Sequence, residues 1–98
     1  MQAEEQAMVL DKMKALSNLA SEHHAQTEIA RFLNETASDL DQKSGVAFTE
    51  GFRYFLNHGK LVKSSSDVTF NTEEQQLWQE LYDMQQVGND LGGAGLQW

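Results

Sequence analysis

Few side chains in this sequence have the types and spacing that chemistry requires. His23 and His24 are adjacent, so on a helix they would point about 100° apart. Two metal-binding histidines on one helix usually stand four residues apart. The chain contains no cysteine, so it has no thiolate ligand. His58, close to Lys60, is typical of a surface histidine. We therefore expect no metal site.

The other candidates for chemistry are pairs of carboxylates. Asp39 and Asp41, and likewise Glu73 and Glu74, could serve general acid–base catalysis. Such pairs need a pocket that moves their pKa values apart, and a chain of this size has little room for one. Solvated charge explains them more simply. The sequence also lacks a nucleophile elbow, a P-loop and a dinucleotide-binding fingerprint. We predict that the protein is not an enzyme and has no cofactor.

Aromatic side chains are concentrated in the last third of the chain. Both tryptophans, Trp78 and Trp98, lie there together with Tyr82. Trp and Tyr are enriched at the centres of protein–protein interfaces, so these residues are candidates for partner binding. The alternative is that Trp78 and Tyr82 belong to the core or its edge, and that Trp98 folds back onto the protein.

Charge is distributed unevenly. The formal net charge of −8 argues against binding to nucleic acid or to an anionic membrane surface. Between residues 46 and 63, Arg53, Lys60 and Lys63 face a single acid, Glu50, whereas residues 71–90 carry five acids and no Lys or Arg. If these two segments pack as neighbours, their opposite charges favour the contact. The acidic charge could select a basic partner or only keep the protein soluble.

The elements that must position these residues are predicted to be helices. Apolar side chains recur at steps of three and four over residues 3–20, 26–42 and 46–62, and again from residue 72 to about residue 91. Ser21 to His24, Ser44-Gly45 and Lys63 to Asp67 separate these segments. The pattern predicts one all-α domain over residues 1–98, an antiparallel up-and-down four-helix bundle with a glycine-rich tail at residues 92–98.

The same periodicity predicts the core. We expect Phe70 to cover one end of it. Gly59 either allows a neighbouring helix to approach closely or marks the end of the third helix near His58-Gly59. The predicted core residues are Val9, Met13, Leu16, Ile29, Phe32, Leu33, Leu40, Phe52, Phe55, Leu56, Leu77, Leu81 and Met84.

Two helix starts carry capping signals. Thr27 is a plausible N-cap of the second helix. Asn71, with Glu74 three residues later, has the spacing of a capping box, in which each side chain accepts from the backbone N–H of the other residue. The fourth helix is therefore predicted to begin next to Asn71.

Composition sets the expected location. Residues 1–14 carry acids where a signal peptide needs positive charge, and no apolar run approaches the ~20 residues of a membrane span. The lack of cysteine is compatible with a reducing compartment. These features predict a cytoplasmic protein that does not insert into the membrane.

The last third of the chain resembles a known family. Its positions Phe70, Gln75, Leu77, Glu80-Leu81, Gly88, Gly92 and Gly95-Leu96 are similar to the C-terminal half of the pediocin-like (class IIa) bacteriocin immunity proteins of the enterocin A type. In that family a last long helix is followed by a short tail containing Gly and Leu. Chain length and helix number also fit. This chain departs from many members in being acidic rather than basic.

The resemblance implies a function and a site. It implies a cytoplasmic protein that protects a cell by binding the mannose phosphotransferase permease in the membrane once a bacteriocin occupies it. It also implies that the C-terminal half sets recognition, here through Leu91, Gly92, Gly95 and Leu96. To these we add Tyr82 and Trp98 from their residue types. The alternative is an acidic helical-bundle adaptor or inhibitor of a basic protein partner, such as a phage or regulatory factor.

Overall fold

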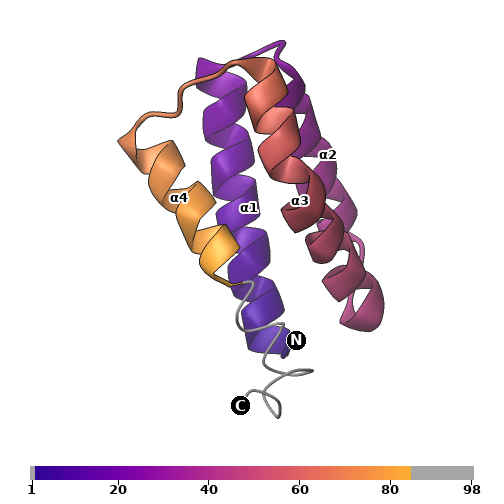
Figure 1. Cartoon of the computed structure of the whole chain (residues 1–98). Coiled ribbons are helices and arrows are strands. Elements are labelled where there is room, and N and C mark those ends of the chain that lie inside the picture. The colour runs from indigo at the N-terminus through magenta and orange to yellow at the C-terminus, as the bar shows by residue number, and fades with distance from the viewer. Residues whose placement is uncertain (1, 85–98) are drawn as a thin grey trace, which may run out of the picture.

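The computed structural model describes residues 2–84, which form four helices and no strand (Figure 1). The helices are α1 (Ala3–His23), α2 (Glu28–Asp41), α3 (Gly45–Ser66) and α4 (Thr72–Asp83). Successive helices run in opposite directions (Figure 1). The predicted all-α four-helix bundle is confirmed. The predicted glycine-rich tail at residues 92–98 lies outside the described residues.

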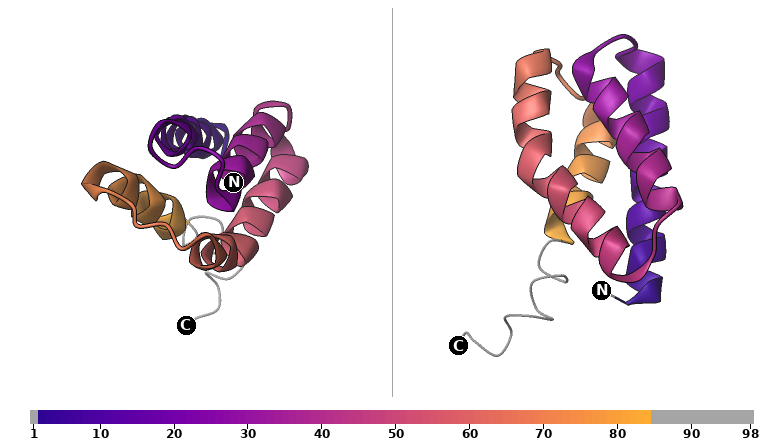
Figure 2. Two further views of the ribbon diagram at one scale, coloured as in Figure 1. Left: turned by 90° about the horizontal axis from the view of Figure 1, so that it is seen from above. Right: turned by 90° about the vertical axis from the view of Figure 1, so that its right-hand side faces the viewer.

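The four helices do not contact one another equally. Helix α1 packs closely against both α2 and α4, and α3 packs closely against α2. The view from above shows α3 and α4 set farther apart (Figure 2). Long aromatic side chains bridge these two helices, as described below. Among residues 2–84, no helix is both long and apolar enough to cross a lipid bilayer.

Two predicted connections are partly helical. Helix α1 continues through His23, so Ser21 to His23 are not a turn, and α3 continues through Ser66, so the loop predicted at Lys63 to Asp67 is wrong. Ser66 Oγ donates to the carbonyl of Val62 at 2.8 Å and accepts from the Ile29 N–H at 2.9 Å. These bonds hold a serine in the last turn of α3 and satisfy an N–H in the first turn of α2. Asp67, with φ of 54°, then ends α3.

Both predicted helix caps are confirmed. Thr27 Oγ1 accepts from the Ala30 N–H at 3.2 Å. Asn71 Oδ1 accepts from the Glu74 N–H, and Glu74 Oε1 accepts from the Asn71 N–H, each at 2.8 Å. Because the first N–H groups of a helix have no partner inside it, these bonds fix where α2 and α4 begin.

The predicted core is largely confirmed, with three exceptions. Phe32, Leu56 and Leu77 are half-buried and pack against the core from its edge. Phe70 is buried, as expected, and so are Phe48 and Trp78. The core residues that were predicted and are buried are Val9, Met13, Leu16, Ile29, Leu33, Leu40, Phe52, Phe55, Leu81 and Met84.

A chain of aromatic contacts runs through the core from α2 to α4. The Phe55 ring stacks on Phe32 of α2, with 5.9 Å between centroids, and meets Trp78 of α4 edge-on at 5.5 Å. Trp78 in turn contacts Phe70 edge-on at 5.5 Å, and Tyr82 lies 5.5 Å from Phe55. Phe55 is thus the ring that joins three helices.

We predict that Phe55→Ala lowers the free energy of unfolding by about 3–5 kcal/mol, because the fully buried ring would leave a cavity. Phe32→Ala should cost clearly less, since the half-buried Phe32 ring already meets solvent. Urea titration of both variants measures the difference. Equal losses for the two variants would contradict the assignment of Phe55 as the central ring.

Candidate functional site

Tyr82, the predicted partner-binding residue that lies within the described part of the chain, faces α3. Its hydroxyl donates to the carbonyl of Leu56 at 3.1 Å. Burial raises the pKa of Tyr82 to about 12. The ring is half-buried and packs on Phe55 and Trp78. Tyr82 therefore serves first to hold α4 against α3, and only part of its surface is open to a partner.

Gly59 makes this contact possible. A Cβ atom at Gly59 would lie 2.7 Å from Tyr82 Oη and 3.1 Å from Trp78 Cη2, both closer than normal contact distances. The prediction that Gly59 is a packing residue is confirmed. The absence of a side chain in α3 allows the two aromatic side chains of α4 to reach the α3 backbone.

Within residues 2–84, the basic helix α3 contacts the acidic α4 and the residue Phe70 before it through aromatic faces, and no ion pair joins α3 to α4. Lys60 Nζ lies 5.0 Å from the centroid of the Tyr82 ring, and Lys63 Nζ lies 4.9 Å from that of Phe70. Cation–π contacts of this kind are worth about 0.5–1 kcal/mol at exposed sites. The acidic side of α4 instead pairs with α1, since Lys12 Nζ lies 2.9 Å from Glu80 Oε1. The hydrogen bond from Lys12 lowers the pKa of Glu80.

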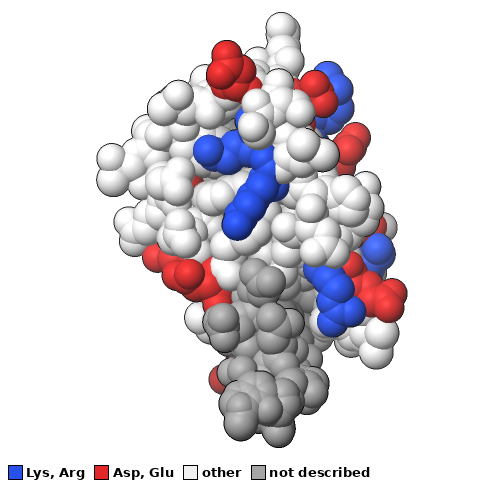
Figure 3. All heavy atoms as spheres, in the orientation of Figure 1, with Lys and Arg blue, Asp and Glu red and all other residues white. Residues whose placement is uncertain are grey.

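A shallow hollow of about 400 Å³ lies between the end of α3 and α4. The view in Figure 3 shows basic side chains over the middle of the molecule and along its right-hand edge, and acidic side chains nearer the edges. Two of the residues that line the hollow, Lys60 and Lys63, place their ammonium groups over aromatic rings. The lining residues are Lys60, Lys63, Ser64, Asp67, Val68 and Trp78.

His24 and Glu74 form a buried pair that sequence reasoning missed. Glu74 is completely buried, and His24 Nε2 donates to Glu74 Oε1 at 2.9 Å. The same oxygen accepts the capping bond from Asn71, while Glu74 Oε2 is buried without a hydrogen-bond donor in residues 2–84. The His24 ring also packs on Phe70, 5.7 Å away. This pair links the turn between α1 and α2 to the start of α4. The capping-box spacing in the sequence indicated the role of Glu74 at the start of α4. It gave no sign that His24 is the side-chain partner of Glu74.

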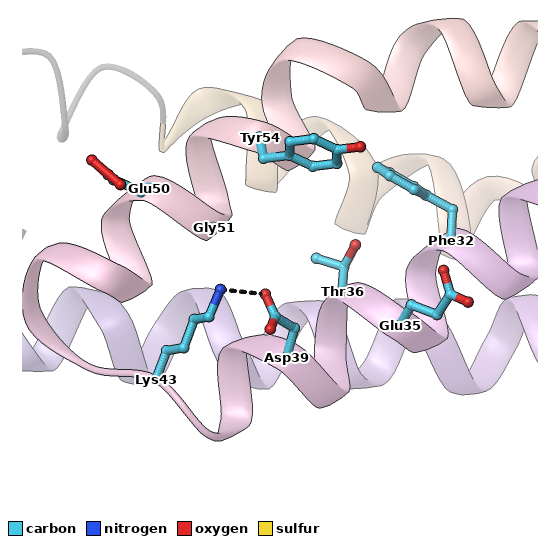
Figure 4. Close-up of a pocket in the computed structure, with 8 residues that line it drawn as sticks. All are labelled: Phe32, Glu35, Thr36, Asp39, Lys43, Glu50, Gly51 and Tyr54. Atoms are coloured by element: carbon cyan, nitrogen blue, oxygen red, sulfur yellow. Dashed lines mark ion pairs between the residues drawn. The ribbon is translucent and has the colours of Figure 1, made fainter.

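A larger groove of about 600 Å³ lies between α2 and α3 (Figure 4). Tyr54 and Phe32 lie on facing helices at its rim, and Lys43 Nζ pairs with Asp39 Oδ2 at 2.8 Å (Figure 4). Gly51 of α3 lies at the contact with α2, where an added Cβ atom would be 2.9 Å from Leu40 Cδ2. The full lining is Phe32, Glu35, Thr36, Asp39, Lys43, Glu50, Gly51 and Tyr54.

The carboxylate pairs that we considered for catalysis are separated by the structure. Asp39 pairs with Lys43, whereas Asp41 Oδ1 lies 3.1 Å from Lys14 Nζ. Glu74 caps α4, and Glu73 is exposed. Within residues 2–84, no three His, Asp or Glu side chains are grouped closely enough to hold a metal ion. Each of the two pairs is thus divided between different partners or surroundings.

The remaining predicted partner-binding residues, Leu91, Gly92, Gly95, Leu96 and Trp98, lie outside the described residues. The described positions of the family resemblance serve mainly to hold α4 in place, since Phe70 and Leu81 are buried and Leu77 is half-buried. Gln75 is exposed on α4. No protein-family model, curated protein or solved structure matches the chain.

We predict that Gly59→Ala is destabilising by about 1–3 kcal/mol, although Ala favours an isolated helix by about 1 kcal/mol. The added methyl group would displace Tyr82 and Trp78. In a Tyr82→Phe background the loss should be smaller, because the nearest atom is gone. Thermal or urea unfolding of the two single variants and the double variant measures the coupling free energy between positions 59 and 82. Equal losses in both backgrounds would show that Tyr82 does not set the constraint.

We also predict that His24→Ala lowers the free energy of unfolding by about 3 kcal/mol, because it leaves the buried Glu74 carboxylate without its side-chain partner. The matched control is His23→Ala. His23 is exposed, and its replacement should cost less than about 0.5 kcal/mol. Urea titration at neutral pH compares the two variants. A small loss for both would mean that the pair is not a major stabilising contact.

Proposed function

We propose that this chain is an immunity protein that protects a bacterial cell against a pediocin-like bacteriocin. It would act from the cytoplasmic side, by binding the mannose phosphotransferase permease that the bacteriocin occupies. The proposal rests on the resemblance of residues 70–96 to that family and on the four-helix fold, which the resemblance also implies.

The anchoring of α4 is the structural observation that supports this proposal best. Phe70 and Leu81 are buried in the core, Glu74 is bonded to His24, and Tyr82 is bonded to α3. Phe70 and Leu81, which belong to the resemblance, thus help to fix the last helix to the bundle, together with Glu74 and Tyr82, which do not. Under the proposal, this rigid support presents the residues that follow α4 to the receptor complex.

The proposal assigns recognition to Leu91, Gly92, Gly95 and Leu96, and to Trp98 from its residue type. A glycine allows backbone conformations that other residues avoid, and a tryptophan offers a large rigid apolar surface. Tyr82 would contribute the exposed part of its ring.

A second candidate function is an adaptor or inhibitor that binds a basic protein. The formal charge of −8 and the carboxylates along the groove between α2 and α3 favour it. Genomic context separates the two candidates, since a neighbouring gene for a small cationic, cysteine-containing peptide would favour immunity.

We predict that expression of the full-length chain in a sensitive strain protects it against at least one member of a panel of pediocin-like bacteriocins. Deletion of residues 95–98 should abolish protection and leave the thermal unfolding of the bundle nearly unchanged, because none of the four periodic apolar stripes in the sequence includes these residues. Growth inhibition and thermal melting are measured side by side.

Three outcomes count against this proposal. Failure of the full-length protein to protect against any bacteriocin of the panel would overturn the proposed function. Full protection by the truncated protein would overturn the role of Leu96 and Trp98 and move recognition to the exposed face of α4. A collapse of the melting temperature would make these residues structural.

A further inference from the structure

The outer face of α3 carries large apolar side chains that no other described helix covers. Val46, Tyr54 and Leu61 are 76%, 58% and 69% exposed. At about 100° per residue, these three positions and Glu50 fall within about 80° of one another around the helix. Single exposed apolar residues are ordinary, but several on one helix face are typical of an interaction surface.

This face adjoins the groove between α2 and α3. Tyr54 and Glu50 belong to both, since they lie on the outer face of α3 and line the groove. On the opposite wall, the half-buried ring of Phe32 is open to the groove (Figure 4). The exposed ring of Tyr54 stacks on His58, with 4.0 Å between ring centroids, which holds the Tyr54 ring in place. A partner would therefore meet an ordered aromatic surface beside a concave channel.

The charges decide what kind of partner fits. The groove is lined by three carboxylates, Glu35, Asp39 and Glu50, and one lysine, Lys43, so its formal charge is 1 − 3 = −2. Lys43 already pairs with Asp39. Glu35 and Glu50 make no ion pair with any residue in the range 2–84. Two carboxylates, one on each wall, are thus available to cations from outside.

We infer that this surface binds a basic amphipathic helix of a partner protein. Apolar side chains of that helix cover Tyr54 and Leu61 and enter the groove beside Phe32, and its Lys or Arg side chains pair with Glu35 and Glu50. A helix with one apolar face laid into a groove is a recurring mode of recognition. A second copy of this chain fits poorly, because it would bring a molecule of charge −8 against an acidic groove. The inference rests on the second candidate function and gives it a location.

The test uses the full chain and a synthetic, fluorescently labelled amphipathic peptide of about 18 leucine and lysine residues. Binding is measured by fluorescence anisotropy and located by amide chemical shifts. We expect shifts concentrated in α2 and α3. The double variant Glu35→Gln/Glu50→Gln should weaken binding about five- to tenfold, because two exposed ion pairs are lost. Tyr54→Ala should weaken binding as well.

A matched variant separates this site from the overall acidic charge. Glu73→Gln/Asp83→Asn removes the same charge from exposed positions of α4, and it should change the affinity less than about twofold. A peptide with leucine replaced by glutamine should bind much more weakly. Equal weakening by both double variants, or chemical-shift changes confined to α4, would show that the peptide does not bind in the groove. The second candidate function would then stand without this location. If the peptide does not bind at all, both the proposed binding site in the groove and the second candidate function are wrong. This result would not bear on the immunity proposal.

Discussion

The buried carboxylate of Glu74 is the constraint on which the arrangement of these helices depends. A carboxylate out of contact with water is costly unless it is well hydrogen-bonded. One of its oxygens accepts from the Asn71 backbone and from the His24 ring, so a single atom connects the start of α4 to the turn between α1 and α2. Once Glu74 is placed there, Phe70 and Trp78 are directed into the core on the same side. The two hydrogen bonds to this one oxygen thus help to fix how α4 lies on α1, while the other oxygen, Oε2, is buried without a donor in residues 2–84.

The contact between α3 and α4 is built differently. Two aromatic side chains of α4 approach the α3 backbone at Gly59, and lysines of α3 lie over aromatic rings beyond it. Because Trp78 and Tyr82 are committed to this contact, they are less available as binding residues than their types suggest. The exposed aromatic residue of the described structure is instead Tyr54, which stands on α3 beside the opposite groove.

Local patterns in the sequence predicted the local features well. Helix number, the caps at Thr27 and Asn71 and most of the core follow from periodicity and from side chains that bond to nearby backbone. Features that depend on distant partners did not follow. The serines that end α3 favour a turn by composition, yet Ser66 bonds to Ile29 of another helix. His24 gains its role from Glu74, which is 50 residues away. The opposite charges of α3 and α4 were visible in the sequence. That the lysines of α3 lie over aromatic rings could be seen only in the packed structure.

The link between His24 and Glu74 also bears on how a short helix is held in the bundle. Helix α4 has 12 residues, and helices of about that length are marginal alone in water. Its start is bonded through Glu74 to His24, in the turn between α1 and α2. The first two helices are joined by a short connection and pack closely against each other. In the packed bundle, the start of α4 is therefore held by a contact with the turn between α1 and α2 as well as by its own capping bonds.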